Sequence, residues 1–208
     1  MTHFAIIYIA ISALMACIVT LSGLKALRRG GLLGRGLGGS SLAAGAATLF
    51  YTCSVLFTEY RLSSAFSSLY FVSMDLVVLY LLAYTRELVH APKTPAATAV
   101  LTGVQCYGVF DVLVMLVNPF YEIALTYKIR PGFSFAIYEY NMLLLYDFHL
   151  IFCFGIVGAV LVMLMLKAVQ VPDEYRLTFI LHSAALIAIV IINVIFLFFK
   201  DHAIFQNL

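Results

Sequence analysis

Three aspartates inside strongly apolar segments are the residues of this chain best placed to do chemistry: Asp75, Asp111 and Asp147. An ionised carboxylate in hydrocarbon is costly, so acids at membrane depth normally face the interior of a helix bundle or a water-filled cavity. No lysine or arginine lies in the core of any apolar segment. We therefore expect these acids to be protonated, hydrated or paired with something that binds.

Further polar residues accompany the aspartates. Tyr146, His149 and Cys153 are separated by three and four residues, which places them on one face of a helix. We expect Asp111, Asp147 and His149 to gather at the outer ends of their helices, and the sequence predicts a ligand-binding pocket formed by Asp111, Asn118, Tyr121, Tyr146, Asp147 and His149.

A second set of polar residues is expected to make intramembrane contacts or to relay a signal: Asp75, Arg176, His182 and Asn193. For His182 a metal or proton role competes with a plain hydrogen bond between helices, and the hydrogen bond is the preferred interpretation.

Motifs typical of enzymes and cofactor sites are missing. The chain has no His-Glu-x-x-His or Gly-x-Ser-x-Gly motif, and its four cysteines form no Cys-x-x-Cys or Cys/His metal pattern. The glycine-rich stretch at residues 30–40 follows no strand and lacks the Gly-Lys-Ser/Thr ending of a phosphate loop, so we expect a flexible connector. We therefore expect free thiols, no metal, no cofactor and no catalytic residue.

The composition defines the elements that must position these residues. Of the 208 residues 64% are hydrophobic and only 11% are charged, and the mean hydropathy is +1.06. This excludes a water-soluble globule, and a net charge of +2 with scattered carriers gives no nucleic-acid surface. Since a bilayer core needs about 20 residues per helix, we expect an all-α polytopic membrane bundle with spans at residues 4–24, 41–58, 65–85, 96–117, 142–166 and 177–199.

The basic residues predict an orientation in the membrane. One set of connections carries twice as many Lys and Arg as the other, namely Lys25, Arg28, Arg29, Arg35, Arg86, Lys93, Lys167 and Arg176, against Arg61, Lys128, Arg130 and Lys200. Because cytoplasmic loops are enriched in these residues, the N-terminus is expected outside. Six spans then leave the C-terminus outside as well, so any cytoplasmic output domain after Leu208 would need a seventh span.

The long outer loop at residues 118–141 is rich in aromatic residues. Apolar side chains alternate on both sides of Pro131-Gly132, which is the pattern of a short β-hairpin. An irregular loop whose aromatic rings lie at headgroup level remains the alternative.

Short motifs in residues 49–199 then resemble a known family: Leu82-Ala83-Tyr84-Thr85, Asn118-Pro119-Phe120-Tyr121, Tyr146-Asp147-Phe148-His149, Tyr175-Arg176 and Ile192-Asn193. They are similar to the N-terminal seven-transmembrane region of bacterial sensor histidine kinases, which is also found fused to GGDEF diguanylate cyclases. Two positions depart from the family pattern: Tyr121 replaces a histidine, and no glutamine follows Arg176 closely.

The resemblance implies a sensory input module of the plasma membrane. It would detect a small-molecule or lipid ligand, or a membrane state, at the outer face and relay it to a cytoplasmic output domain of the same chain, as a homodimer. The module itself would not be an enzyme. A small proton- or cation-coupled transporter that uses Asp75 is the alternative function, although the halves show no clear repeat.

Overall fold

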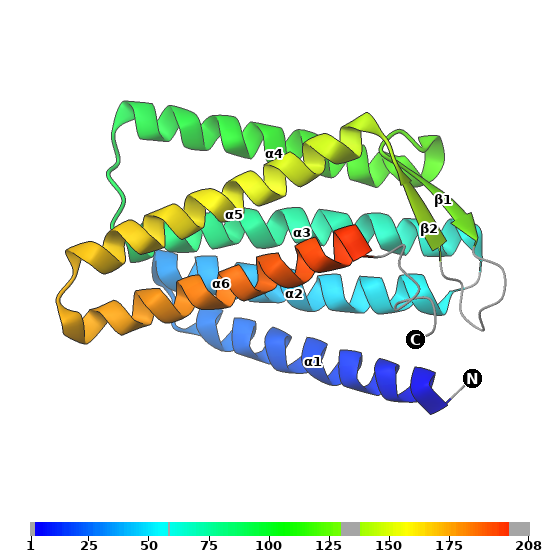
Figure 1. The fold of residues 1–208 in the computed structure, drawn as a ribbon, viewed down its shortest axis with the longest axis horizontal. Coiled ribbons are helices and arrows are strands. Elements are labelled where there is room, and N and C mark those ends of the chain that lie inside the picture. The colour runs from blue at the N-terminus through cyan, green and yellow to red at the C-terminus, as the bar shows by residue number, and fades with distance from the viewer. Residues whose placement is uncertain (1–2, 58, 130–137, 200–208) are drawn as a thin grey trace. The chain divides into compact units, whose positions relative to one another are not determined.

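The computed structural model describes residues 3–57, 59–129 and 138–199. These ranges form six helices and one pair of strands, and the pair lies between the fourth and fifth helices (Figure 1): α1 (His3–Arg28), α2 (Gly31–Leu56), α3 (Tyr60–Leu88), α4 (Pro95–Tyr121), β1 (Leu125–Ile129), β2 (Tyr138–Met142), α5 (Leu144–Gln170) and α6 (Asp173–Phe199).

All six helices are long and apolar enough to cross a membrane. This confirms the expected helical membrane bundle, and the chain is a multi-pass membrane protein. Each predicted span overlaps one helix, but the helices extend beyond the apolar cores because helical hydrogen bonding continues into polar residues at the ends. The fifth predicted span began too early, since Met142 belongs to β2.

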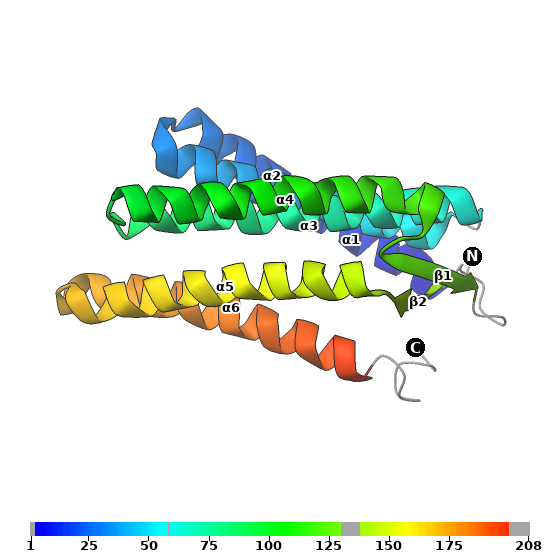
Figure 2. The same cartoon turned by 90° about the horizontal axis from the view of Figure 1, so that it is seen from above.

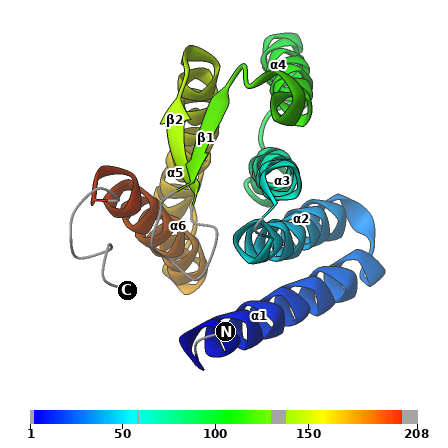
Figure 3. The same cartoon turned by 90° about the vertical axis from the view of Figure 1, so that its right-hand side faces the viewer.

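The chain forms two compact units, Met1–Ile156 and Val157–Leu208, and each is described by itself. In the first unit α2 packs against both α1 and α3, and α3 also packs against α4. The end-on view in Figure 3 shows these four helices following one another in chain order.

The glycine-rich stretch is helical, so the prediction of a flexible connector was wrong. Only Gly30 and Gly31 have the positive φ of a turn, 70° and 71°, and α2 begins at Gly31. At the later glycines a side chain would collide with a neighbouring helix. A Cβ at Gly36 would lie 2.8 Å from the backbone of Tyr84, and one at Gly38 would lie 2.9 Å from Gly23 O. Glycine is used here for close helix approach, as is common between membrane helices.

The strands β1 and β2 pair antiparallel between the end of α4 and the start of α5, with Leu125 opposite Met142 and Ile129 opposite Tyr138 (Figure 2). The predicted turn at Pro131-Gly132 and the second predicted strand lie outside the described residues. The strands nevertheless define one end of the first unit, which we call the hairpin end. Tyr60 at the start of α3 donates a hydrogen bond to Glu122 there.

Candidate functional site

One histidine bridges two buried carboxylates in the interior of the first unit. His149 of α5 places Nδ1 2.8 Å from Asp111 Oδ2 of α4 and 3.2 Å from Asp75 Oδ1 of α3. The exposed fractions of the three side chains are 3%, 2% and 0%. The aspartates therefore have a partner within the bundle, whereas the sequence alone suggested that only protonation, water or a bound species could compensate them.

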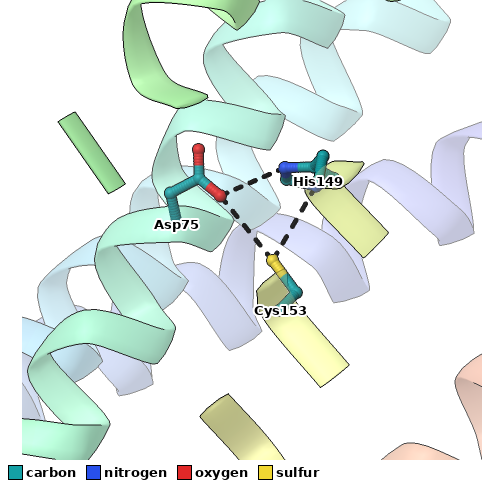
Figure 4. A group of neighbouring side chains, drawn as sticks. All are labelled: Asp75, His149 and Cys153. Atoms are coloured by element: carbon teal, nitrogen blue, oxygen red, sulfur yellow. Dashed lines mark hydrogen bonds and ion pairs between the residues drawn. The ribbon is translucent and has the colours of Figure 1, made fainter. Parts of the chain in front are cut away.

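Cys153 joins this group one turn further along α5 (Figure 4). Its thiol donates to Asp75 Oδ1 at 3.6 Å, and its Sγ lies 3.9 Å from His149 Nε2. We call Asp75, Asp111, His149 and Cys153 the buried cluster. Residues four apart lie on the same face of a helix, so α5 presents His149 and Cys153 together to Asp75.

Two aromatic rings hold the imidazole in place. Tyr146 lies nearly parallel to His149, with centroids 5.6 Å apart and planes inclined by 28°. Phe71 meets the imidazole edge to face, at 5.5 Å and 83°. Both rings are buried. The buried cluster therefore lies in an apolar, water-poor setting, where attraction between charges is stronger than in water.

Asp147 does not join the buried cluster, contrary to the expected grouping with Asp111 and His149. It is exposed in α5. Residues two apart in a helix point in very different directions, so burying His149 turns Asp147 away. Asp75, which we assigned to a separate relay set, takes the place expected for Asp147.

Asn118 and Tyr121 lie at the hairpin end but differ in environment. Asn118 is 0% exposed and accepts hydrogen bonds from the backbone N–H groups of Ala124 and Leu125, at 2.8 and 2.9 Å. It also donates from Nδ2 to Leu125 O at 3.1 Å. Tyr121 is 73% exposed. Asn118 thus anchors β1 to α4, and the structure does not bring Tyr121 into a pocket.

The remaining predicted residues lie in the second unit. Arg176 pairs with Asp173 at 2.7 Å and donates from Nε to Ala168 O at 3.2 Å, so it ties the start of α6 to the end of α5. His182 is exposed and has Nδ1 2.7 Å from Thr178 O. The side chain of Asn193 lies outside the described part of the chain.

A row of buried serines on α3 was not predicted as part of the site. Ser64 and Ser68 lie on the same helical face as Asp75, at spacings of four and seven residues. The two hydroxyl groups and Asp75 Oδ2 are buried and have no hydrogen-bond partner among the described residues. Buried polar groups are normally paired, so this face offers unsatisfied polar atoms between the hairpin end and the buried cluster.

A cavity of about 260 Å³ lies beside α3 and α4 without reaching the buried cluster. Its lining is mostly apolar: Leu76, Leu79, Tyr80, Leu82, Ala83, Leu101 and Gln105. Among the described residues, the titratable side chains that contact one another in the interior therefore lie in the buried cluster rather than in this cavity.

No family model, curated protein or solved structure matches this chain.

Proposed function

We propose that this chain is the membrane-embedded input module of a bacterial signal-transduction protein, related to the seven-transmembrane regions of sensor histidine kinases and diguanylate cyclases. The observation that carries the proposal is the buried cluster, in which one imidazole joins carboxylates from two other helices. Such a bridge has discrete states, made or broken, and a stimulus that favours one state shifts the arrangement of the helices.

The position of the buried cluster suits reception of an outside signal. His149 lies five residues after the start of α5, and Asp111 lies ten residues before the end of α4. Both helices meet the strand pair at the hairpin end. In the orientation indicated by the basic loops this end faces outward, so a change at β1 and β2 reaches the bridge within a few turns of helix. The cytoplasmic ends of the helices then pass the change to an output domain.

The test makes the same change, Asp to Asn, at two positions of the full-length protein. In native membranes we expect Asp111→Asn to change basal kinase or cyclase output at least about fivefold, which corresponds to the lower range of allosteric coupling energies. Asp147→Asn removes a charge from an exposed position of α5 and serves as the matched control. Wild-type output in the Asp111→Asn protein, with normal expression, would contradict the proposal.

The transporter hypothesis rests on a different observation. Asp75 lies near the middle of α3, and its Oδ2 is buried without a described partner. A carboxylate in this position can bind a proton or cation during transport. Substrate-dependent proton uptake by the chain in liposomes, lost in Asp75→Asn and kept in Asp147→Asn, would favour transport over sensing.

A further inference from the structure

The buried cluster combines three types of metal-binding atom in one place. Asp75 offers a carboxylate oxygen, His149 an imidazole nitrogen and Cys153 a sulfur, and these atoms lie within 4.8 Å of one another (Figure 4). Asp75 and His149 are buried and Cys153 is partly buried. Zinc binds this mixture of oxygen, nitrogen and sulfur ligands in proteins.

Two of the three distances between the proposed ligand atoms are close to those around a tetrahedral ion. With bonds of about 2.0–2.3 Å, two ligand atoms on tetrahedral zinc lie about 3.3–3.6 Å apart. Cys153 Sγ is 3.6 Å from Asp75 Oδ1 and 3.9 Å from His149 Nε2. The first distance already lies in this range and the second exceeds it by about 0.3 Å. Asp75 Oδ1, which lies 3.2 Å from Nδ1 in the structure, would turn toward Nε2 when the ion binds.

The fourth member of the cluster has the role of an outer carboxylate. Asp111 Oδ2 accepts a hydrogen bond from His149 Nδ1 at 2.8 Å, and this tautomer leaves the lone pair of Nε2 on the side of Cys153. Metal-binding histidines commonly donate their other N–H to a carboxylate, which fixes the ring and raises its basicity. Stacking on Tyr146 adds to this orientation.

We propose that Asp75, His149 and Cys153 bind one divalent transition-metal ion of the zinc class, with Asp111 as the positioning carboxylate. On binding, the Cys153 thiol releases its proton to solvent, and the imidazolium that pairs with the two carboxylates releases its Nε2 proton as well. The thiolate and Nε2 then bind the ion, and one Asp75 oxygen is the third ligand. A fourth position stays open for water or another ligand. The buried hydroxyls of Ser64 and Ser68 lie on the same face of α3 as Asp75, toward the hairpin end.

Binding is independent of the proposed sensory function and is measured without any output domain. The purified chain in lipid nanodiscs is titrated with Co²⁺, whose thiolate charge-transfer absorption in the near ultraviolet reports a cobalt–sulfur bond. We expect this band to saturate at one Co²⁺ per chain and to disappear when Zn²⁺ is added. Absence of the band, or its persistence in excess Zn²⁺, would overturn the proposal.

Substitutions assign the ligands. Cys153→Ser should abolish the band, while Cys106→Ser, at an exposed cysteine of α4, should leave it unchanged. Asp111→Asn should keep the band but weaken Co²⁺ affinity by about 10–100-fold, as for other outer-sphere partners. A band that survives Cys153→Ser would contradict the assignment. Circular dichroism establishes that each variant keeps its helical content.

A second measurement needs no variant and so does not depend on folding of mutants. The wild-type chain is alkylated with a membrane-permeant maleimide, with and without Zn²⁺, and the extent at each cysteine is read by peptide mass spectrometry. Zn²⁺ should slow alkylation of Cys153 at least tenfold and leave Cys106 unaffected. Equal protection of both thiols, or of neither, would overturn the proposal. If Zn²⁺ binds but output in the full-length protein does not respond to it, the ion is structural; the sensory role is then decided by the output of Asp111→Asn.

Discussion

At the scale of single residues, His149 is the group on which two buried carboxylates depend. Its Nδ1 lies within hydrogen-bonding distance of both Asp75 and Asp111. Both acids are buried, so water cannot replace the histidine as their partner. Removing one member of a buried ionic network is more costly than the network is favourable, because an uncompensated charge remains. The cluster should therefore respond strongly to loss of the histidine and weakly to changes outside it.

We expect His149→Gln to destabilise the chain by about 3–5 kcal/mol, the range measured when one partner of a buried ion pair is removed. Thermal unfolding in detergent, followed by circular dichroism, measures the change. Asp147→Asn is the matched control on the same helix and should lie within about 0.5 kcal/mol of wild type. Adding Asp111→Asn to His149→Gln should cost less than the sum of the two single changes. Strict additivity would mean that the two side chains do not interact.

Asn118 supports a second prediction at this scale. Replacement by Ala leaves the buried N–H groups of Ala124 and Leu125 unpaired. Each unpaired group should lower the free energy of unfolding by about 1–3 kcal/mol. Asn118→Asp keeps an acceptor oxygen for these two amides, so their exchange should accelerate less than in Asn118→Ala, although this variant loses the donor to Leu125 O and buries a charge. Hydrogen exchange at these two amides is the measurement, and it should accelerate at least tenfold in Asn118→Ala. Unchanged exchange would show that Asn118 does not hold β1; Asn141→Ala, at an exposed position of β2, is the control.

At the scale of elements, the glycines of α2 set how closely three helices approach. Gly36 faces the backbone of Tyr84 in α3, and Gly39 faces the ring of Tyr80. On the other side Gly38 faces Leu27 and Gly23 of α1. A membrane helix gains little from hydrophobic contact with its neighbours, so packing at short distance contributes much of the association.

Gly36→Ala should separate α2 from α3, since its Cβ would lie 2.8 Å from backbone atoms of Tyr84 that cannot move away alone. We expect destabilisation of about 1–3 kcal/mol from overpacking, despite the better helix propensity of alanine. Gly103→Ala in α4 is the matched control, because nothing lies within 4 Å of its added Cβ. That change should be neutral or stabilising by up to about 1 kcal/mol. If both variants unfold at the same temperature, close contact at Gly36 does not contribute to stability.

The elements also show where prediction from sequence succeeded and where it did not. Hydropathy located all six helices, because about 20 apolar residues have few alternatives to a membrane span. The glycine-rich stretch was misread, since the same composition serves a flexible linker and a tightly packed helix. The neighbouring helices decide whether such a stretch becomes a linker or a helix. Rules that use only the local sequence do not include these neighbours.

The buried cluster was predictable in part. The spacing of His149 and Cys153 places them on one helical face, so a joint role could have been expected from the sequence alone. The choice of Asp75 over Asp147 depends on the rotation of α5 and on which helices touch. The spacing of Tyr146, His149 and Cys153 marks one face of α5, but it does not show which helices that face contacts.

At the scale of the whole molecule, the orientation of the helices in the membrane decides which events the buried cluster can report. Three helices, α2, α3 and α4, lie between the α1–α2 turn and the hairpin end along the chain. The turn and the hairpin end therefore lie on opposite sides if α2, α3 and α4 all cross the bilayer. The basic residues beside the α1–α2 turn, Arg28 and Arg29, predict that this turn is cytoplasmic.

Single added cysteines measure this orientation in intact cells. Gly30→Cys lies in the α1–α2 turn and Asn141→Cys at an exposed position of β2. We expect a membrane-impermeant maleimide to label Asn141→Cys in intact cells and Gly30→Cys only after the cells are opened, because the reagent reacts with water-accessible thiols. The wild-type chain, whose four cysteines lie in helices, is the control for background labelling. Labelling of Gly30→Cys alone in intact cells would reverse the orientation and place the hairpin end in the cytoplasm. The buried cluster would then lie near the cytoplasmic face of the membrane, which is incompatible with detection of an external signal.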